Sequence, residues 1–200
     1  MSFFNRQAAE QFDAPTTAVE DISGDYTIDP THSHTEFAVR HLMISTVKGR
    51  FGGLAGTVVT DETDPARVEV DITIDVNSLD TREPQRDAHL KSPDFFDAAA
   101  FPAITFTSRR VQPAAGGAFA LTGDLTLRGV TREVVLDVTI EGEGRDPWGN
   151  HRTGFSATGR ISRKDFGLTW NQLLETGGVA VGDEVKITID TELIQQVAAA

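Results

Sequence analysis

Strict alternation of apolar and polar residues is the sequence feature that most constrains the fold of this chain. In the segment 68–76, VEVDITIDV, every even-numbered residue is apolar and every odd-numbered residue is polar. The segment 185–193, VKITIDTEL, repeats the pattern with one threonine on the apolar side. A period of two places successive side chains on opposite faces of a strand, so these segments are predicted to be half-buried antiparallel strands. Shorter runs of the same kind lie at 35–41, 121–127, 134–140 and 155–161.

Turns rich in glycine and proline separate these runs, among them Gly52-Gly53 and Asp64-Pro65. We count about eight or nine strands. Such strands hide one apolar face either by packing two sheets together or by closing into an up-and-down barrel. Small residues at inward positions, such as Gly49 and Gly159, favour a barrel with an internal cavity. We therefore predict an all-β fold, a single extended antiparallel up-and-down β-barrel of about eight strands.

Two segments depart from the strand pattern. Residues 1–23 have no clear period and are predicted to form an N-terminal arm, flexible or in a short helix, ahead of a barrel domain over 24–197. The break at 77–103 predicts a short helical insertion near 83–99. Within it we expect one helix near 83–91 and a second near 93–99, the latter begun by Ser92-Pro93-Asp94.

Composition excludes several classes of function. With 30 acidic and 18 basic residues the formal net charge is −12, which argues against a nucleic-acid partner or an anionic membrane surface. The absence of cysteine excludes disulfides, thiolate metal sites and cysteine nucleophiles. No stretch approaches the roughly 20 apolar residues of a membrane span, so stable membrane insertion is not expected. The first residues lack a basic start followed by an apolar run, which predicts a cytoplasmic protein without a secretory signal.

Catalytic motifs are missing from the sequence. It contains no Gly-x-Ser-x-Gly, no phosphate-binding loop, no dinucleotide fingerprint and no His-Glu-x-x-His, so we predict that the protein is not an enzyme. His32 and His34 stand two residues apart, as in some three-histidine zinc sites. The sequence places no third ligand beside them, so no metal site is predicted. A metal-assisted hydrolase using His32 and His34 is kept as an alternative, against a polar pair at the barrel mouth.

Three other polar residues are candidates for the rim of a cavity. His41 shares its strand face with Phe37 and Val39, so we expect it to point into the interior or its rim. There it would be either a structural residue or a contact for the polar head of a ligand. Arg86 and His89 lie in a charged helical segment, which is either a solvated face or a polar rim over one barrel mouth.

Short fragments in a fixed order carry a resemblance to a known family. They include Tyr26-Thr-Ile-Asp29, His32-Ser33, Gly49-Arg-Phe51, Asp87-Ala-His89-Leu90, Asp94-Phe95-Phe96-Asp97, Phe101-Pro102 and Arg163-x-Asp-Phe-Gly167. Their order over residues 25–194 resembles the YceI-like family of lipocalin-like, polyisoprenoid-binding proteins. This resemblance implies a lipocalin-like barrel with a long cavity for isoprenoid or other long-chain lipids, including the tails of quinones, and no catalysis.

The predicted function is non-catalytic binding, storage or carriage of one long-chain apolar ligand inside the barrel. A polyisoprenoid, an isoprenoid quinone or a fatty-acid derivative would fit, and no other cofactor is expected. His41, Arg86 and His89 are the predicted contacts for its head group. A stress-related interaction protein with a filled barrel is a further alternative, and a homodimer is left open. The residues predicted to line the cavity are Phe37, Val39, Val70, Ile72, Ile74, Phe106, Leu125, Leu127, Leu136, Val138, Phe155, Ile187 and Ile189.

Overall fold

The computed structural model describes residues 24–61, 64–174 and 178–196. The arm predicted at 1–23 lies outside the described residues. One α-helix, α1, spans Pro84–Lys91. The strands are β1 (Gly24–Ile28), β2 (His34–His41), β3 (Ser45–Phe51), β4 (Leu54–Asp61), β5 (Asp64–Asp75), β6 (Leu79–Asp80), β7 (Ala103–Pro113), β8 (Phe119–Leu127), β9 (Val130–Arg145), β10 (His151–Ser162) and β11 (Val181–Gln195).

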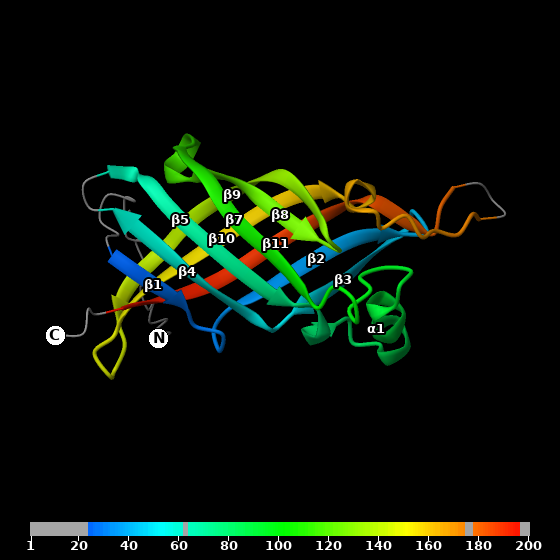
Figure 1. The fold of residues 1–200 in the computed structure, drawn as a ribbon, viewed down its shortest axis with the longest axis horizontal. Helices are drawn as coiled ribbons and strands as arrows, with labels where there is room; N and C mark the ends of the chain where they lie inside the picture. Colours follow the sequence, from blue (N-terminus) through cyan, green and yellow to red (C-terminus); the bar gives the residue numbers. More distant parts are fainter. Residues whose placement is uncertain (1–23, 62–63, 175–177, 197–200) are drawn as a thin grey trace, which may run out of the picture.

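Eight strands close into an antiparallel barrel, as the alternating pattern predicted. Their order is β1-β4-β5-β7-β8-β9-β10-β11, and β11 returns to pair with β1. The long strand β11 pairs with β1 near its end, where Leu193 faces Ile28, and with β2 over its earlier part. As a result β2, β3 and β6 extend the sheet beyond the closed ring, toward the end that carries α1 (Figure 1).

The alternation in the sequence corresponds to alternating burial in the barrel wall. On β5, Val70 and Ile74 are 7% and 8% exposed, whereas Asp71 and Thr73 on the other face are exposed. On β9, Leu136 is buried while its neighbour Val135 is exposed. The apolar sides of the strands together form one continuous core that runs along the barrel.

Two inward glycines accommodate phenylalanine rings of neighbouring strands. A Cβ atom at Gly49 on β3 would lie 2.4 Å from the ring of Phe37, and one at Gly123 on β8 would lie 2.3 Å from the ring of Phe106. Both distances are far below van der Waals contact, so a side chain at either position would displace the ring. We expected small inward residues to leave space for a ligand. At these two positions they instead give space to the protein's own aromatic side chains.

The helix α1 covers one end of the barrel. At this end the sheet stays open, because β6 is the last strand in the order and pairs only with β3. Pro84 opens the helix, and the Glu83 carboxylate accepts from the backbone N–H groups of Gln85 (3.3 Å) and Arg86 (2.6 Å). Such a cap satisfies amides that have no partner within the helix. The predicted helix near 83–91 is therefore present over Pro84–Lys91.

The second helix, expected near 93–99, is absent, and that prediction was wrong. Residues 92–102 form a series of turns whose amides donate back to the end of α1, as in Phe96 N to Leu90 O (3.0 Å) and Ala98 N to Lys91 O (2.9 Å). Asp97 has a left-handed φ of 49°, which a right-handed helix does not allow. Arg128, at the β8–β9 turn, holds this segment by donating to the carbonyl of Pro93 (2.7 Å).

No helix within the described ranges is both long enough and apolar enough to cross a membrane.

Candidate ligand-binding cavity

An apolar cavity of about 140 Å³ lies inside the barrel at the end covered by α1. Leu90 of α1, with Phe95 and Phe96 from the turns after it, contributes to the wall. The other lining residues come mainly from inward positions of β2, β5, β7, β8, β9 and β11, and almost all are aliphatic or aromatic. Because a cavity of this kind offers no hydrogen bonds to water, it favours an apolar occupant.

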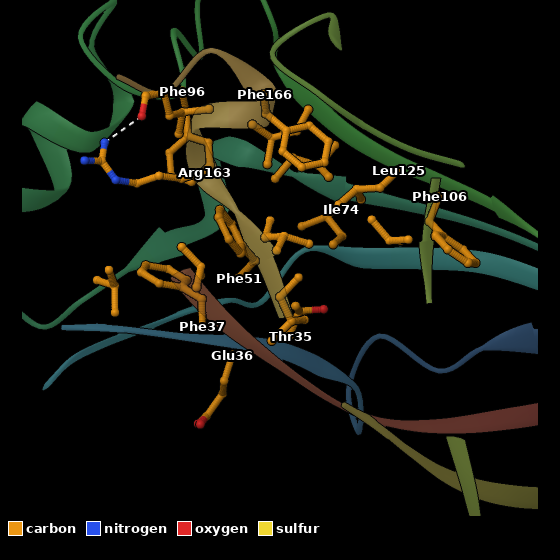
Figure 2. Close-up of a pocket in the computed structure, with 18 of the residues that line it drawn as sticks. Thr35, Glu36, Phe37, Phe51, Ile74, Phe96, Phe106, Leu125, Arg163 and Phe166 are labelled. Carbon is orange, nitrogen blue, oxygen red and sulfur yellow. Dashed lines mark hydrogen bonds between the residues drawn. The ribbon is translucent and has the colours of Figure 1, made fainter. Parts of the chain in front are cut away.

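Aromatic rings form one side of this cavity, as Figure 2 shows. The ring of Phe51 on β3 lies 5.7 Å from that of Phe37 on β2, and 5.6 Å from that of Phe96 at an interplanar angle of 87°. These are favourable spacings for aromatic pairs. The Phe51–Phe96 contact links the barrel wall to the segment after α1, so the cover and the cavity are built together.

A second apolar cavity of about 110 Å³ continues the interior toward the other end of the barrel. It is lined by residues such as Ile28, Val58 and Phe119, which do not reach the first cavity. Three residues line both cavities, so they form a waist between two chambers that lie end to end. These waist residues are Ile72, Leu136 and Ile189.

The sequence-predicted lining residues all lie on these walls. Those on the first cavity are Phe37, Val39, Ile72, Ile74, Phe106, Leu125, Leu127, Leu136, Ile187 and Ile189. Val70, Val138 and Phe155 line the second. Their contact with a ligand stays a prediction. Sequence reasoning missed Phe51, Phe166 and Leu168, of which the last two stand outside the alternating strands and therefore carried no periodic signal.

The three predicted head-group residues are not on either wall. Arg86 donates from Nε to Thr81 Oγ1 and from Nη2 to the Thr81 carbonyl, both at 2.7 Å. It therefore braces the start of α1. His41 lies on the same face of β2 as Phe37 and Val39. Val39 is, however, the last residue of this strand that lines the cavity. Contact of these three side chains with the head group of a ligand stays a prediction.

His89 instead packs behind the cavity wall, in a cluster that includes the lining residue Phe95. Its Nε2 lies 3.0 Å from Asp94 Oδ2, and its ring stands edge-on to Trp170 and Phe95 at centroid distances of 4.9 and 5.1 Å. Phe95 also contacts Trp170, at 5.1 Å. This cluster fixes the end of α1 against the segment after β10, and so it holds the cover in place.

Arg163 is the one deeply buried cation on the wall of the first cavity within the described residues, at 4% exposure. Its guanidinium donates to four backbone carbonyls, at 2.6 Å to Leu168, 2.8 Å to Trp170, 2.9 Å to Gly182 and 3.4 Å to Val181, and to the Asp183 carboxylate at 3.5 Å. Burial lowers the pKa of Arg163, and Asp183 opposes this shift. With its donors occupied, Arg163 anchors the segment between β10 and β11 and presents little to a ligand.

Ion pairs connect residues from β10 and β11 with the residue that follows β1. We call this network, formed by Asp29, Asp146, Arg152 and Glu192, the polar clasp. The Asp29 carboxylate, which follows β1, accepts from Arg152 Nη1 on β10 at 2.6 Å, and the same nitrogen donates to Glu192 on β11 at 2.9 Å. Arg152 Nε also donates to Asp146 at 3.0 Å. Hydrogen bonds from Arg152 and His32 hold the pKa of Asp29 well below its usual range.

This clasp also bears on the metal-site alternative. Among the described residues, the one group of three potential ligands whose donor atoms lie close together is Asp29, His32 and Glu192. His34 is not part of it and lies 3.6 Å from Asp190 instead. Because Arg152 already supplies the positive charge between Asp29 and Glu192, the geometry does not favour a zinc site built on His32 and His34.

The clasp predicts a specific acid sensitivity. Because the pKa of Asp29 is lowered in the folded state, its stabilising effect is complete above the unfolded-state pKa of about 4 and is lost as the pH falls below it. We expect Asp29→Asn to destabilise the protein at neutral pH, and the gap to the unsubstituted protein to shrink steadily below about pH 4. Urea unfolding across this pH range measures the gap, and a constant gap would contradict the assignment.

Comparison with known proteins places this architecture in a known group. The chain matches the YceI-like domain family over residues 26–193. It is 40% identical to Protein YceI of Salmonella newport over 177 residues, covering 88% of this chain and 89% of that protein. Its fold matches Burkholderia cenocepacia BcnA with a TM-score of 0.71 and 26% identity, covering 82% of this chain and 98% of the other.

Two further solved structures show the same fold. The Campylobacter jejuni YCEI protein matches with a TM-score of 0.66 and 32% identity, covering 79% of this chain and 90% of the other. A polyisoprenoid-binding domain from Saccharophagus degradans, implicated in plant cell wall breakdown, matches with a TM-score of 0.65, covering 86% and 98%. At 18% identity, that likeness is one of fold.

Proposed function

Because the chain belongs to the YceI-like family, we propose that its barrel binds one long-chain apolar ligand and carries out no reaction on it. The supporting observation is the pair of apolar cavities that share Ile72, Leu136 and Ile189 and together follow the barrel axis. A polyisoprenoid, the tail of an isoprenoid quinone or a long acyl chain has the slender shape that such an interior admits. The Saccharophagus degradans structure is that of a polyisoprenoid-binding domain, which agrees with this ligand class.

The apolar chain supplies the binding energy in this proposal. Burial of a methylene-sized group yields about 0.8 kcal/mol, so a five-carbon isoprene unit contributes roughly 3–4 kcal/mol. Several units would sum to more than the practical ceiling of about −18 to −21 kcal/mol, so the cost of ordering the chain must offset much of the gain. Affinity is therefore expected to grow with chain length until both cavities are filled.

The charged residues on the wall support a binding role over catalysis. Glu36 is 45% exposed and points away from the cavity (Figure 2). Arg163 directs its donors to backbone carbonyls. General acid–base chemistry needs a titratable side chain within hydrogen-bond reach of the reacting atoms. Neither residue is placed for that, so storage or carriage of an unaltered ligand is the function that the geometry supports best.

Extraction of the purified protein with organic solvent, followed by mass spectrometry, tests the proposal. We expect a long-chain lipid to be released from the protein and to be absent from an unrelated acidic protein prepared in the same way. Adding a prenyl or acyl chain to the extracted and refolded protein should raise its unfolding temperature, because a ligand that binds only the folded state stabilises it. A protein that yields no lipid and takes up neither chain would overturn the proposal.

A further inference from the structure

Apolar side chains stand exposed at the turn between β2 and β3. Leu42, Met43 and Ile44 are 37%, 56% and 79% exposed, and Leu173 in the segment before β11 is 85% exposed. The Leu42 amide donates at 2.8 Å to the carbonyl of Ala180, whose neighbour in the chain pairs with Leu173. The two segments therefore meet at one end of the molecule (Figure 1). We call Leu42, Met43, Ile44 and Leu173 the apolar tip.

The β2–β3 turn is built from residues that are poorly suited to its backbone. Its two central residues, Leu42 and Met43, have left-handed φ angles of 51° and 62°, and the Ile44 amide closes the turn by donating to the His41 carbonyl at 3.1 Å. Such turns favour asparagine and glycine, because larger side chains are strained at positive φ. Stability of the hairpin therefore does not require Leu42 or Met43, whereas a role in binding accounts for both exposed apolar side chains.

Positive charge lies directly behind the apolar tip, although the chain as a whole is acidic. The hairpin carries Arg40 and Lys48, and the sequence has no acidic residue from 37 to 60. Both side chains are exposed, as is Lys186 on β11, and the register places Lys48 and Lys186 on either side of Ala38. In the part of the chain that the structure describes, none of these three cations pairs with a carboxylate.

The acidic residues at the start of β11 do not cancel this charge, because they have cations of their own. Asp183 accepts from Lys164 Nζ at 2.7 Å, and Glu184 pairs with Arg160. The charge left beside the apolar tip is therefore positive. Apolar side chains backed by lysine and arginine complement a phospholipid surface, where acyl chains lie beneath a layer of phosphates. The net charge of −12 disfavours contact of the rest of the protein with that surface.

The apolar tip also borders the first cavity. Val39 on β2 and Val181 on β11 line that cavity, and Val181 pairs with His41, the residue before Leu42. We propose that the apolar tip docks on the surface of a phospholipid bilayer and brings the first cavity within reach of chains dissolved there. Docking itself is independent of the proposed function, whereas transfer of a ligand from the bilayer rests on it.

Single-cysteine labelling tests the contact, because the chain contains no other cysteine. Ile44→Cys is labelled with the environment-sensitive fluorophore nitrobenzoxadiazole. The matched control is Trp148→Cys, since Trp148 is 82% exposed in the β9–β10 turn at the other end of the barrel (Figure 1). Vesicles with one phosphatidylglycerol for every four phosphatidylcholine molecules should shift the emission at position 44 to the blue and raise its intensity. The label at position 148 should not respond.

A triple variant removes the apolar side chains and keeps the turn. Leu42→Asn, Met43→Gly and Ile44→Thr together should lower the protein recovered with floating vesicles by at least about tenfold. The unfolding temperature should be unchanged or higher, because asparagine and glycine suit this turn. Binding of a ten-carbon prenyl chain from solution should be unchanged, since the cavity wall at Val39 and Val181 is intact.

The outcomes separate docking from the proposed function. Equal flotation of the triple variant and the unsubstituted protein, or a label at position 44 that ignores the vesicles, would overturn docking. Self-association that the triple variant loses, without flotation of the unsubstituted protein, would also overturn docking and assign the apolar tip to a second copy of the chain. Failure of the unsubstituted protein to bind the ten-carbon chain from solution would instead overturn the proposed function, and flotation would still decide docking.

Discussion

Replacing Arg163 with leucine should lower the free energy of unfolding by about 3–5 kcal/mol. The substitution removes three hydrogen bonds of 2.6–2.9 Å and leaves the carbonyls of Leu168, Trp170 and Gly182 without their donor. Each carbonyl that stays buried and unpaired costs roughly 1–3 kcal/mol. For a chain of this size the unfolding temperature should fall by about 10 °C or more, which calorimetry or circular dichroism measures directly.

A second arginine, three residues earlier in the chain, provides the control. Arg160 on β10 is 64% exposed and pairs with the equally exposed Glu184, so Arg160→Leu should change stability by less than about 1 kcal/mol. Arg163→Lys should recover only part of the loss, because an ammonium group cannot reproduce the planar fork of donors that spans the three carbonyls. Equal effects of the Arg160 and Arg163 substitutions would contradict an anchoring role for Arg163.

The strands and the inward residues could be predicted because their signal is local. A period of two assigns each side chain to one face of a strand, and closure of the barrel turns one face inward for every strand at once. Phe37, Ile72 and Leu125 were placed on the cavity wall by this parity alone. Nothing about their distant neighbours had to be known.

The polar features escaped prediction because they depend on contacts between distant residues. Asp29 and Arg152 are 123 positions apart, and neither shows a pattern that points to the other. The pair His32 and His34 was interpreted with strand geometry, but His32 lies in the turn before β2 and bonds to Asp29. Thr35 has the parity of a lining residue, yet only the structure shows that its hydroxyl is unpaired.

The segment that covers the barrel was mispredicted for a related reason. Ser92-Pro93-Asp94 has the composition of a helix start, but the amides that follow it donate back to the end of α1. Contacts such as Phe51–Phe96 then fix the segment against β3. Tertiary contacts of this kind override local propensity, and they also brought Phe95 and Phe96 to the cavity wall.

Replacing Ile72 with tryptophan should divide the interior and make binding depend on chain length. Ile72 lines both cavities and is only partly buried, so an indole can extend into the space at the waist. Loss of about one isoprene unit from the second cavity corresponds to roughly 3–4 kcal/mol, so a twenty-carbon prenyl chain should bind at least about 100-fold more weakly. A ten-carbon chain, which needs only one cavity, should lose little affinity.

The adjacent outward position supplies the matched control for this prediction. Thr73→Trp places the same indole on the exposed face of β5, and both chain lengths should bind to it as they do to the unsubstituted protein. Titration of both chains against the three proteins measures the length dependence. Unchanged binding to the Ile72 variant would place the ligand outside the barrel. An equal loss for both chain lengths would show that the two cavities act as one short site. A loss confined to the longer chain would indicate that one ligand occupies both cavities through the waist.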